Sequence, residues 1–266
     1  MVTGNLDRPG GVMFPRPAVD LVSRLSPGGL GRRFTRVRGL PAFGGELPVA
    51  ALAEEIDTPG EGQVRALVTI AGNPVVSTPN SGRLDAALAG LEAYVAVDPY
   101  LNETTRHADV VLPVPTALQR SHYDLALLQL AIRNVAHYSP AVLPLDEGQL
   151  PEWQVMARLA LVAQGMGADA DPALVDDLVI RSLVDAAVGD EHGPLHGRDP
   201  DEVLDELGER RGPERILDFM VRTGPYGDGF GARPGGLTFD TLAAAEHGID
   251  LGPLEPRLPE VLRTPS

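Results

Sequence analysis

Two segments of the chain combine amide, hydroxyl and carboxylate groups at a spacing suited to binding a phosphorylated ligand. The first segment runs from Gly72 to Asn80 and reads GNPVVSTPN. Gly72 permits a tight turn and the close approach of a ligand, and Asn73 can both donate and accept hydrogen bonds. Ser77, Thr78 and Asn80 supply further donors just before an expected helix, whose N-terminus attracts anions. The pattern indicates phosphate binding, although ordinary turn residues in a strand-to-helix loop explain it equally.

The second segment begins at Asp98, which lies 26 residues after Gly72. In dinucleotide-binding units an acidic residue about 20 residues downstream of the glycine loop commonly binds ribose hydroxyls. A carboxylate can also accept two N–H bonds from the edge of a guanine. Alternatively, Asp98 caps a helix that follows Pro99. The residues by themselves leave both interpretations open.

The elements around these segments predict a parallel sheet. Apolar runs predict strands, and amphipathic spacing predicts helices between them. The expected strands cover residues 64–71, 94–97 and 109–112, and the expected helices cover 47–56, 81–91 and 102–107. Strands that alternate with helices indicate an α/β fold with a parallel sheet and helices on both faces, as in Rossmann-like domains. Ligands of such sheets bind outside the carboxyl ends of the strands, where both segments would lie.

The rest of the chain is expected to be mainly helical, with an irregular C-terminal tail. A short helix is expected near the N-terminus, one or two strands within 125–137, and several longer helices further on. These helices are predicted over residues 17–26, 152–165, 172–188, 200–207 and 213–222, and only 239–245 looks helical in the tail.

Composition excludes several classes of function. The 266 residues carry a net charge of −15, which disfavours nucleic-acid binding through a basic surface. There is no cysteine, so disulfides, thiolate zinc sites and cysteine-ligated iron–sulfur clusters are excluded within this chain. No apolar run approaches the ~20 residues of a membrane helix, and the N-terminus lacks the apolar stretch of a signal peptide. We therefore expect no membrane insertion and a cytoplasmic location.

A longer motif contains both segments. GNPVVSTPN followed by VAVDPYLNETTRHADVVLP resembles the molybdopterin oxidoreductase family, which includes formate dehydrogenases, nitrate reductases and dimethyl sulfoxide reductases. The ending ADVVLP at 108–113, at this distance from Asp98 and Glu103, carries most of the resemblance. TGNLDRPGG at 3–11 resembles a segment upstream of this motif in the family. GPYG at 224–227 and HGIDLG at 247–252 resemble a connector that leads toward the C-terminal barrel of the family.

The resemblance implies a cofactor and a set of contacts. In this family molybdenum or tungsten is held by two pterin guanine dinucleotides, and two α/β domains each hold one nucleotide arm; this chain resembles the second domain. Gly72, Asn73 and Pro74 would approach the phosphates, and Asp98 would recognise the guanosine. Ser77 and Asn80 would be further contacts, and Glu103 and Thr104 would shape the same pocket. No catalytic or metal-ligating residue is implied, because the redox chemistry belongs to the metal and the pterin.

The resemblance also predicts the organisation of the chain. Residues 1–140 would form the α/β region that binds the cofactor nucleotide, and 141–222 a mainly helical continuation of the same domain. Residues 223–266 would be a Gly/Pro-rich connector toward a missing barrel. We expect part of a larger oxidoreductase, inactive alone, whose partners are the remaining domains and an unknown electron-transfer protein.

Two other hypotheses remain. A stand-alone, non-catalytic nucleotide-binding module would use the same two loops, and only the connector-like tail argues against it. A structural or assembly protein that had lost the pocket is disfavoured because Asn73 and Asp98 are still present.

Overall fold

The computed structural model of the chain describes residues 2–20 and 31–261. The chain forms two compact units. One comprises Leu25–Thr116 with Glu147–Gln149 and is called the sheet unit here; the other comprises Met1–Arg24, Ala117–Asp146 and Leu150–Ser266 and is called the helical unit.

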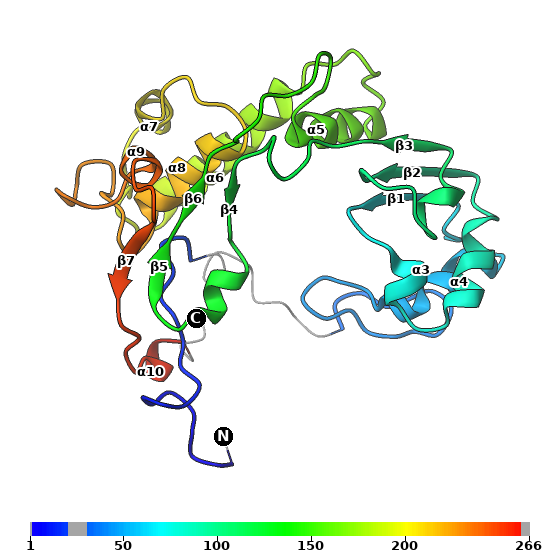
Figure 1. The fold of residues 1–266 in the computed structure, drawn as a ribbon, viewed down its shortest axis with the longest axis horizontal. Helices are drawn as coiled ribbons and strands as arrows, with labels where there is room; N and C mark the ends of the chain where they lie inside the picture. The colour runs from blue at the N-terminus through cyan, green and yellow to red at the C-terminus, as the bar shows by residue number, and fades with distance from the viewer. Residues whose placement is uncertain (1, 21–30, 262–266) are drawn as a thin grey trace. The chain divides into compact units, whose positions relative to one another are not determined.

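The sheet unit is built on three parallel strands in the order β1-β2-β3 (Figure 1). They are β1 (Ala66–Ile70), β2 (Ala93–Val97) and β3 (Val110–Leu112). Ile70 pairs with Val97, which pairs in turn with Leu112, so the carboxyl ends of the three strands lie level. The expected α/β class with a parallel sheet is confirmed.

Short helices connect and cover these strands. They are η1 (Val49–Ala51), α2 (Leu52–Asp57), α3 (Pro74–Ser77), α4 (Ser81–Leu88) and η2 (Thr105–His107). Ile56 of α2 and Leu84 and Leu88 of α4 form a buried apolar cluster, and Leu67 of β1 packs against it. Burial of such side chains contributes about 1.5–3 kcal/mol each, which holds these helices to one face of the sheet.

On the opposite face of the sheet, side chains of the two outer strands are exposed, although Val97 of the central strand is buried. Side chains on a strand alternate between faces, so Val68 and Ile70 point away from the face of Leu67. Val68 and Ile70 are each 51% exposed, and Val110 on β3 is 47% exposed. The expected second layer of helices, and with it the Rossmann-like arrangement, is therefore not confirmed.

The helical unit contains the longer helices of the chain. They are α5 (Glu152–Ala163), α6 (Ala173–Gly189), α7 (Pro200–Glu206), α8 (Pro213–Thr223) and α9 (Phe239–Ala243). Ile180, Val184, Leu207, Phe219 and Leu242 are among the side chains buried in its core. All five helices lie where the periodicity predicts them, with ends that differ by a few residues.

A buried ion pair links two of these helices. Arg215 of α8 contacts Asp176 of α6, with 2.7 Å between Nη2 and Oδ2, and their side chains are 9% and 1% exposed. Asp177 accepts a second bond from the same guanidinium nitrogen, also at 2.7 Å. Paired charges of this kind are costly to break, because removal of one partner leaves the other buried and unpaired.

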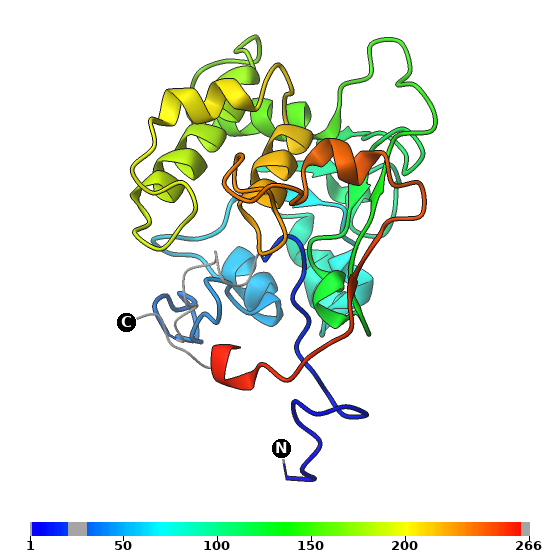
Figure 2. The same cartoon turned by 90° about the vertical axis from the view of Figure 1, so that its left-hand side faces the viewer.

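Short strands and the two ends of the described chain complete the helical unit. β4 (His122–Tyr123) pairs with β6 (Tyr138–Ser139), and β5 (Asn134–Ala136) pairs with β7 (Ile249–Gly252). The N-terminal stretch runs beside α10 (Leu258–Val261), as Figure 2 shows, and Arg257 donates to Pro15 O at 2.7 Å.

The region 125–137 holds one strand, β5, as expected, preceded by the short helix η3 (Leu127–Leu130). Two other expectations about secondary structure need correction. The tail is more ordered than expected, since it contains β7 and α10 besides α9. The loop from Gly72 to Asn80 contains α3, because Pro74 supplies the fixed φ of a first helical residue. The helix expected over 17–26 lies largely outside the described residues. None of the described helices is long and apolar enough to cross a bilayer.

Candidate functional site

The two predicted segments lie side by side at the carboxyl edge of the sheet. Ala71 follows β1 and donates its N–H to the carbonyl of Val97 at 3.0 Å. Asp98 follows β2 and donates its N–H to the carbonyl of Leu112 at 3.2 Å. The parallel register thus extends one residue past each strand, so the Gly72 loop and the Asp98 loop begin next to each other.

Three of the predicted residues form one hydrogen-bonded group. The amide nitrogen of Asn73 donates to Glu103 Oε2 at 2.7 Å, and its oxygen accepts from Thr104 Oγ1 at 2.6 Å. Thr104 Oγ1 also accepts the backbone N–H of Val75 at 3.0 Å, and Thr104 is fully buried. This group fixes the loop after β1 to the loop after β2.

The backbone of the first loop presents unpaired donors. Neither Gly72 N–H nor Asn73 N–H has a hydrogen-bond partner among the described residues. The carbonyl of Asn73 instead accepts from Ser77 Oγ and from Ser77 N–H, both at 3.0 Å. Consecutive backbone N–H groups in a loop are a typical anion-binding arrangement.

At the start of this loop, the left-handed conformation is adopted by Ala71 and not by Gly72. Ala71 has φ of 51°, a conformation that costs a non-glycine residue about 1 kcal/mol. A Cβ added to Gly72 would meet nothing nearer than 3.8 Å, so the turn itself does not require glycine there. The absence of a side chain at Gly72 leaves the space beside the two free N–H groups open.

Asp98 is almost completely buried yet keeps one oxygen free. Its exposure is 5%, and its Oδ1 accepts the N–H of Tyr100 at 2.8 Å. Its Oδ2 has no hydrogen-bond partner among the described residues. This oxygen is also not one of the unpaired side-chain atoms that are completely shielded from solvent. The carboxylate is therefore held in a fixed orientation with an oxygen available to a ligand.

Asn80 lies apart from this group. It precedes α4 with φ of 62°, is exposed, and makes no side-chain capping bond. Its left-handed backbone suits asparagine, which tolerates this conformation better than most residues. The structure therefore places Asn80 as a helix-entry residue, near the N-terminus of α4.

The sequence reasoning missed two residues that organise the second loop. Asn102 Oδ1 accepts the N–H groups of Thr104 and Thr105, at 2.9 and 3.0 Å. Thr105 is fully buried, and its hydroxyl donates to the carbonyl of Tyr100 at 2.8 Å. An asparagine that accepts backbone N–H groups two and three residues later is a recognisable turn signal, so N-E-T-T could have indicated it.

Hydrogen bonding perturbs the acidic groups at the edge of the site. The pKa of Glu103 is lowered, chiefly by the hydrogen bond from Asn73. The pKa of Asp85 on α4 is lowered by its bonds to His107 and Arg106. Both carboxylates are therefore ionised and occupied by partners at neutral pH.

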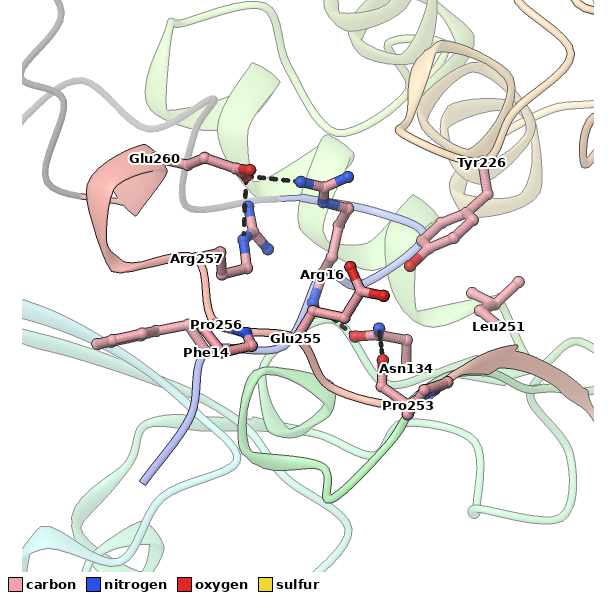
Figure 3. A pocket seen from close by; sticks show the side chains of 10 residues that line it. All are labelled: Phe14, Arg16, Asn134, Tyr226, Leu251, Pro253, Glu255, Pro256, Arg257 and Glu260. Carbon is pink, nitrogen blue, oxygen red and sulfur yellow. Dashed lines mark hydrogen bonds and ion pairs between the residues drawn. The ribbon is translucent and has the colours of Figure 1, made fainter. Parts of the chain in front are cut away.

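A separate cavity of about 270 Å³ lies in the helical unit, and its charged groups face each other (Figure 3). Arg16 Nη2 contacts Glu260 Oε2 at 2.6 Å, and Arg257 Nε lies 3.4 Å from the same oxygen. Glu255 also lines the cavity, so its two cations are balanced by two carboxylates. Among the described residues no group of three or more His, Cys, Asp or Glu could hold a metal ion.

Comparison with known proteins identifies relatives of part of the chain. Residues 34–133 match the molybdopterin oxidoreductase family, and this range contains all eight predicted site residues. The chain is 27% identical over 158 residues to the assimilatory nitrate reductase catalytic subunit of Bacillus subtilis, covering 58% of this chain and 21% of that protein.

Two further relatives match at similar identity. The NADPH-Fe(3+) oxidoreductase subunit alpha of Geobacter sulfurreducens is 29% identical over 141 residues, covering 52% of this chain and 16% of the relative. The F420-dependent formate dehydrogenase 1 subunit alpha of Methanococcus maripaludis is 30% identical over 125 residues, covering 42% and 18%. The chain thus spans 16–21% of the length of these three relatives.

Proposed function

Because residues 34–133 belong to the molybdopterin oxidoreductase family, we propose that the sheet unit binds one guanine dinucleotide arm of a molybdenum or tungsten bis-pterin cofactor. The observation that carries the proposal is that free backbone donors and a free carboxylate oxygen lie at the same edge of the sheet. The free N–H groups of Gly72 and Asn73 suit a phosphate, and the free oxygen of buried Asp98 suits the N–H edge of guanine.

The residues fit this group in distinct ways. Gly72 and Asn73 would bind the phosphates through their backbone, where Gly72 leaves room for an anion. The side chain of Asn73 is already occupied by Glu103 and Thr104, so its role is to hold the loop in place. Pro74 starts α3, and Ser77 donates to the carbonyl of Asn73, so both residues would hold the loop in the conformation that leaves the two N–H groups free.

Asp98 would select the base. Guanine presents N1–H and N2–H donors to a carboxylate, whereas adenine presents an acceptor at N1. Asn80, at the start of α4, would lie within the more distant part of the nucleotide site. The metal and the pterin supply the redox chemistry once bound, and the residues of this chain bind and orient the nucleotide arm.

The activity of the parent enzyme is a further proposal. The relatives are an assimilatory nitrate reductase, an NADPH-Fe(3+) oxidoreductase and a formate dehydrogenase, and this chain corresponds to a minor part of each. We expect the 266-residue chain to show no turnover alone, and to act with the remaining domains of an oxidoreductase and an electron-transfer partner. A stand-alone nucleotide-binding module is the second candidate, since it needs only the same two loops.

Binding of guanosine diphosphate to the purified chain tests the nucleotide site. Titration calorimetry should show tighter binding of guanosine diphosphate than of adenosine diphosphate. Asp98→Asn should weaken guanosine diphosphate binding by about 10- to 100-fold, because a charged hydrogen-bond acceptor is lost. The same variant should bind xanthosine diphosphate better than the wild type does, since the introduced amide can donate to the C2 carbonyl of xanthine.

Glu92→Gln is the matched control. Glu92 is an exposed carboxylate immediately before β2, at the opposite end of the same strand, and its side chain is 65% exposed. Its loss changes the net charge by the same amount and should leave nucleotide affinity within about twofold. Equal affinities of the wild type for the two diphosphates would contradict the assignment of Asp98 to guanine.

A further inference from the structure

A large aromatic side chain stands in solvent next to the proposed base site. Tyr100 follows Asp98 by two residues and is 73% exposed, and Leu101 beside it is 77% exposed. No hydrogen bond or ring contact of the Tyr100 side chain is found among the described residues.

The backbone that carries this ring is fixed on both sides. Tyr100 N–H donates to Asp98 Oδ1 and its carbonyl accepts from Thr105 Oγ1, each at 2.8 Å. Thr105 Oγ1 also accepts Asn102 N–H at 2.8 Å, so the loop closes on a fully buried hydroxyl. A ligand that contacts this loop therefore does not have to order its backbone first.

We propose that Tyr100 is the stacking surface for the purine base whose edge Asp98 recognises, an assignment that rests on the proposed function. The bond from Tyr100 N–H to Asp98 Oδ1 holds the carboxylate and the backbone that carries the ring in one turn. A planar base that bonds to the carboxylate through its edge offers its face to a neighbouring ring. Aromatic side chains bind bases in this way without regard to which base is present.

The two residues then have separate effects on binding. Asp98 discriminates guanine from adenine through hydrogen bonds, whereas Tyr100 contributes affinity that any purine shares. Leu101 is equally exposed but has no π face, so it serves as the natural control for simple loss of apolar surface.

The test measures guanosine diphosphate binding to the full chain and to three variants. Tyr100→Ala should weaken binding by about 5- to 100-fold, the range for loss of one base–aromatic stack. Tyr100→Phe should bind within about twofold of the wild type because it keeps the ring, and Leu101→Ala should do the same. The melting temperature of each variant should stay unchanged, since both side chains are exposed. A nuclear Overhauser effect between guanine H8 and the ring protons of Tyr100 should be present in the wild type.

The outcomes separate this inference from the proposed function. If the wild type binds guanosine diphosphate and Tyr100→Ala binds equally well, stacking is refuted while the nucleotide site stands. If Tyr100→Phe binds guanosine diphosphate as weakly as Tyr100→Ala does, the hydroxyl and not the ring contributes the affinity, and the inference is refuted. If the wild type binds no guanosine diphosphate at all, the proposed function fails and the inference fails with it.

Discussion

Loss of the Thr104 hydroxyl should most clearly disrupt the contact between the two loops of the candidate site. This hydroxyl accepts Val75 N–H and donates to Asn73 Oδ1, and the residue is 0% exposed. Thr104→Val keeps the shape of the side chain but leaves a buried N–H without a partner. Leaving the N–H of Val75 without a partner should cost about 1–3 kcal/mol, and leaving the half-buried amide oxygen of Asn73 without its donor should cost somewhat less. We expect a total loss of about 2–4 kcal/mol in the free energy of unfolding.

Urea unfolding and native-state hydrogen exchange together measure this effect. Exchange at the amides of β1 and β2 assigns the change to the sheet unit, which matters because a chain with two compact units need not unfold in a single step. Thr104→Ser keeps the hydroxyl and loses one methyl group, so it should cost only about 1 kcal/mol. Guanosine diphosphate affinity should fall in Thr104→Val and persist in Thr104→Ser. A loss below about 0.5 kcal/mol for Thr104→Val would refute the role assigned to this hydroxyl.

Two further predictions concern charge. The hydrogen bond from Asn73 lowers the pKa of Glu103 below its ordinary value of 4.5. The ionised Glu103 therefore stabilises the fold fully at a pH above 4.5, and this stabilisation is lost as the pH falls through the lowered pKa. Carbon-detected NMR titration should show this lowered pKa, and Asn73→Ala should return it toward 4.5; an unchanged pKa in that variant would contradict the contact. In the helical unit, Arg215→Met should cost about 3 kcal/mol, because buried Asp176 keeps only Arg211, which lies 3.9 Å away and is 52% exposed. Arg211→Met should cost at most about 1 kcal/mol, because Arg215 still pairs with Asp176 at 2.7 Å. Thermal unfolding checks both variants, and similar losses would show that burial does not govern these pairs.

The sequence by itself predicted the parallel α/β core, the long helices and the position of both site loops. These succeed because strand and helix periodicity are local properties, and because parallel strands bring their carboxyl ends to one edge whatever surrounds them. Asn73, Glu103 and Thr104 are in direct contact there, whereas Asn80 lies apart from them.

Only the tertiary structure decided what each of these residues does. Asn73 is polar and follows a glycine, yet its side chain is used within the protein, and it is the backbone N–H groups that remain free. Ala71 and not Gly72 adopts the left-handed conformation, and Tyr100 is left exposed because Asp98 and Thr105 hold its backbone. Sequence cannot show which donors of the first loop are paired, because their partners lie about 30 residues away and are brought together only when the strands pair.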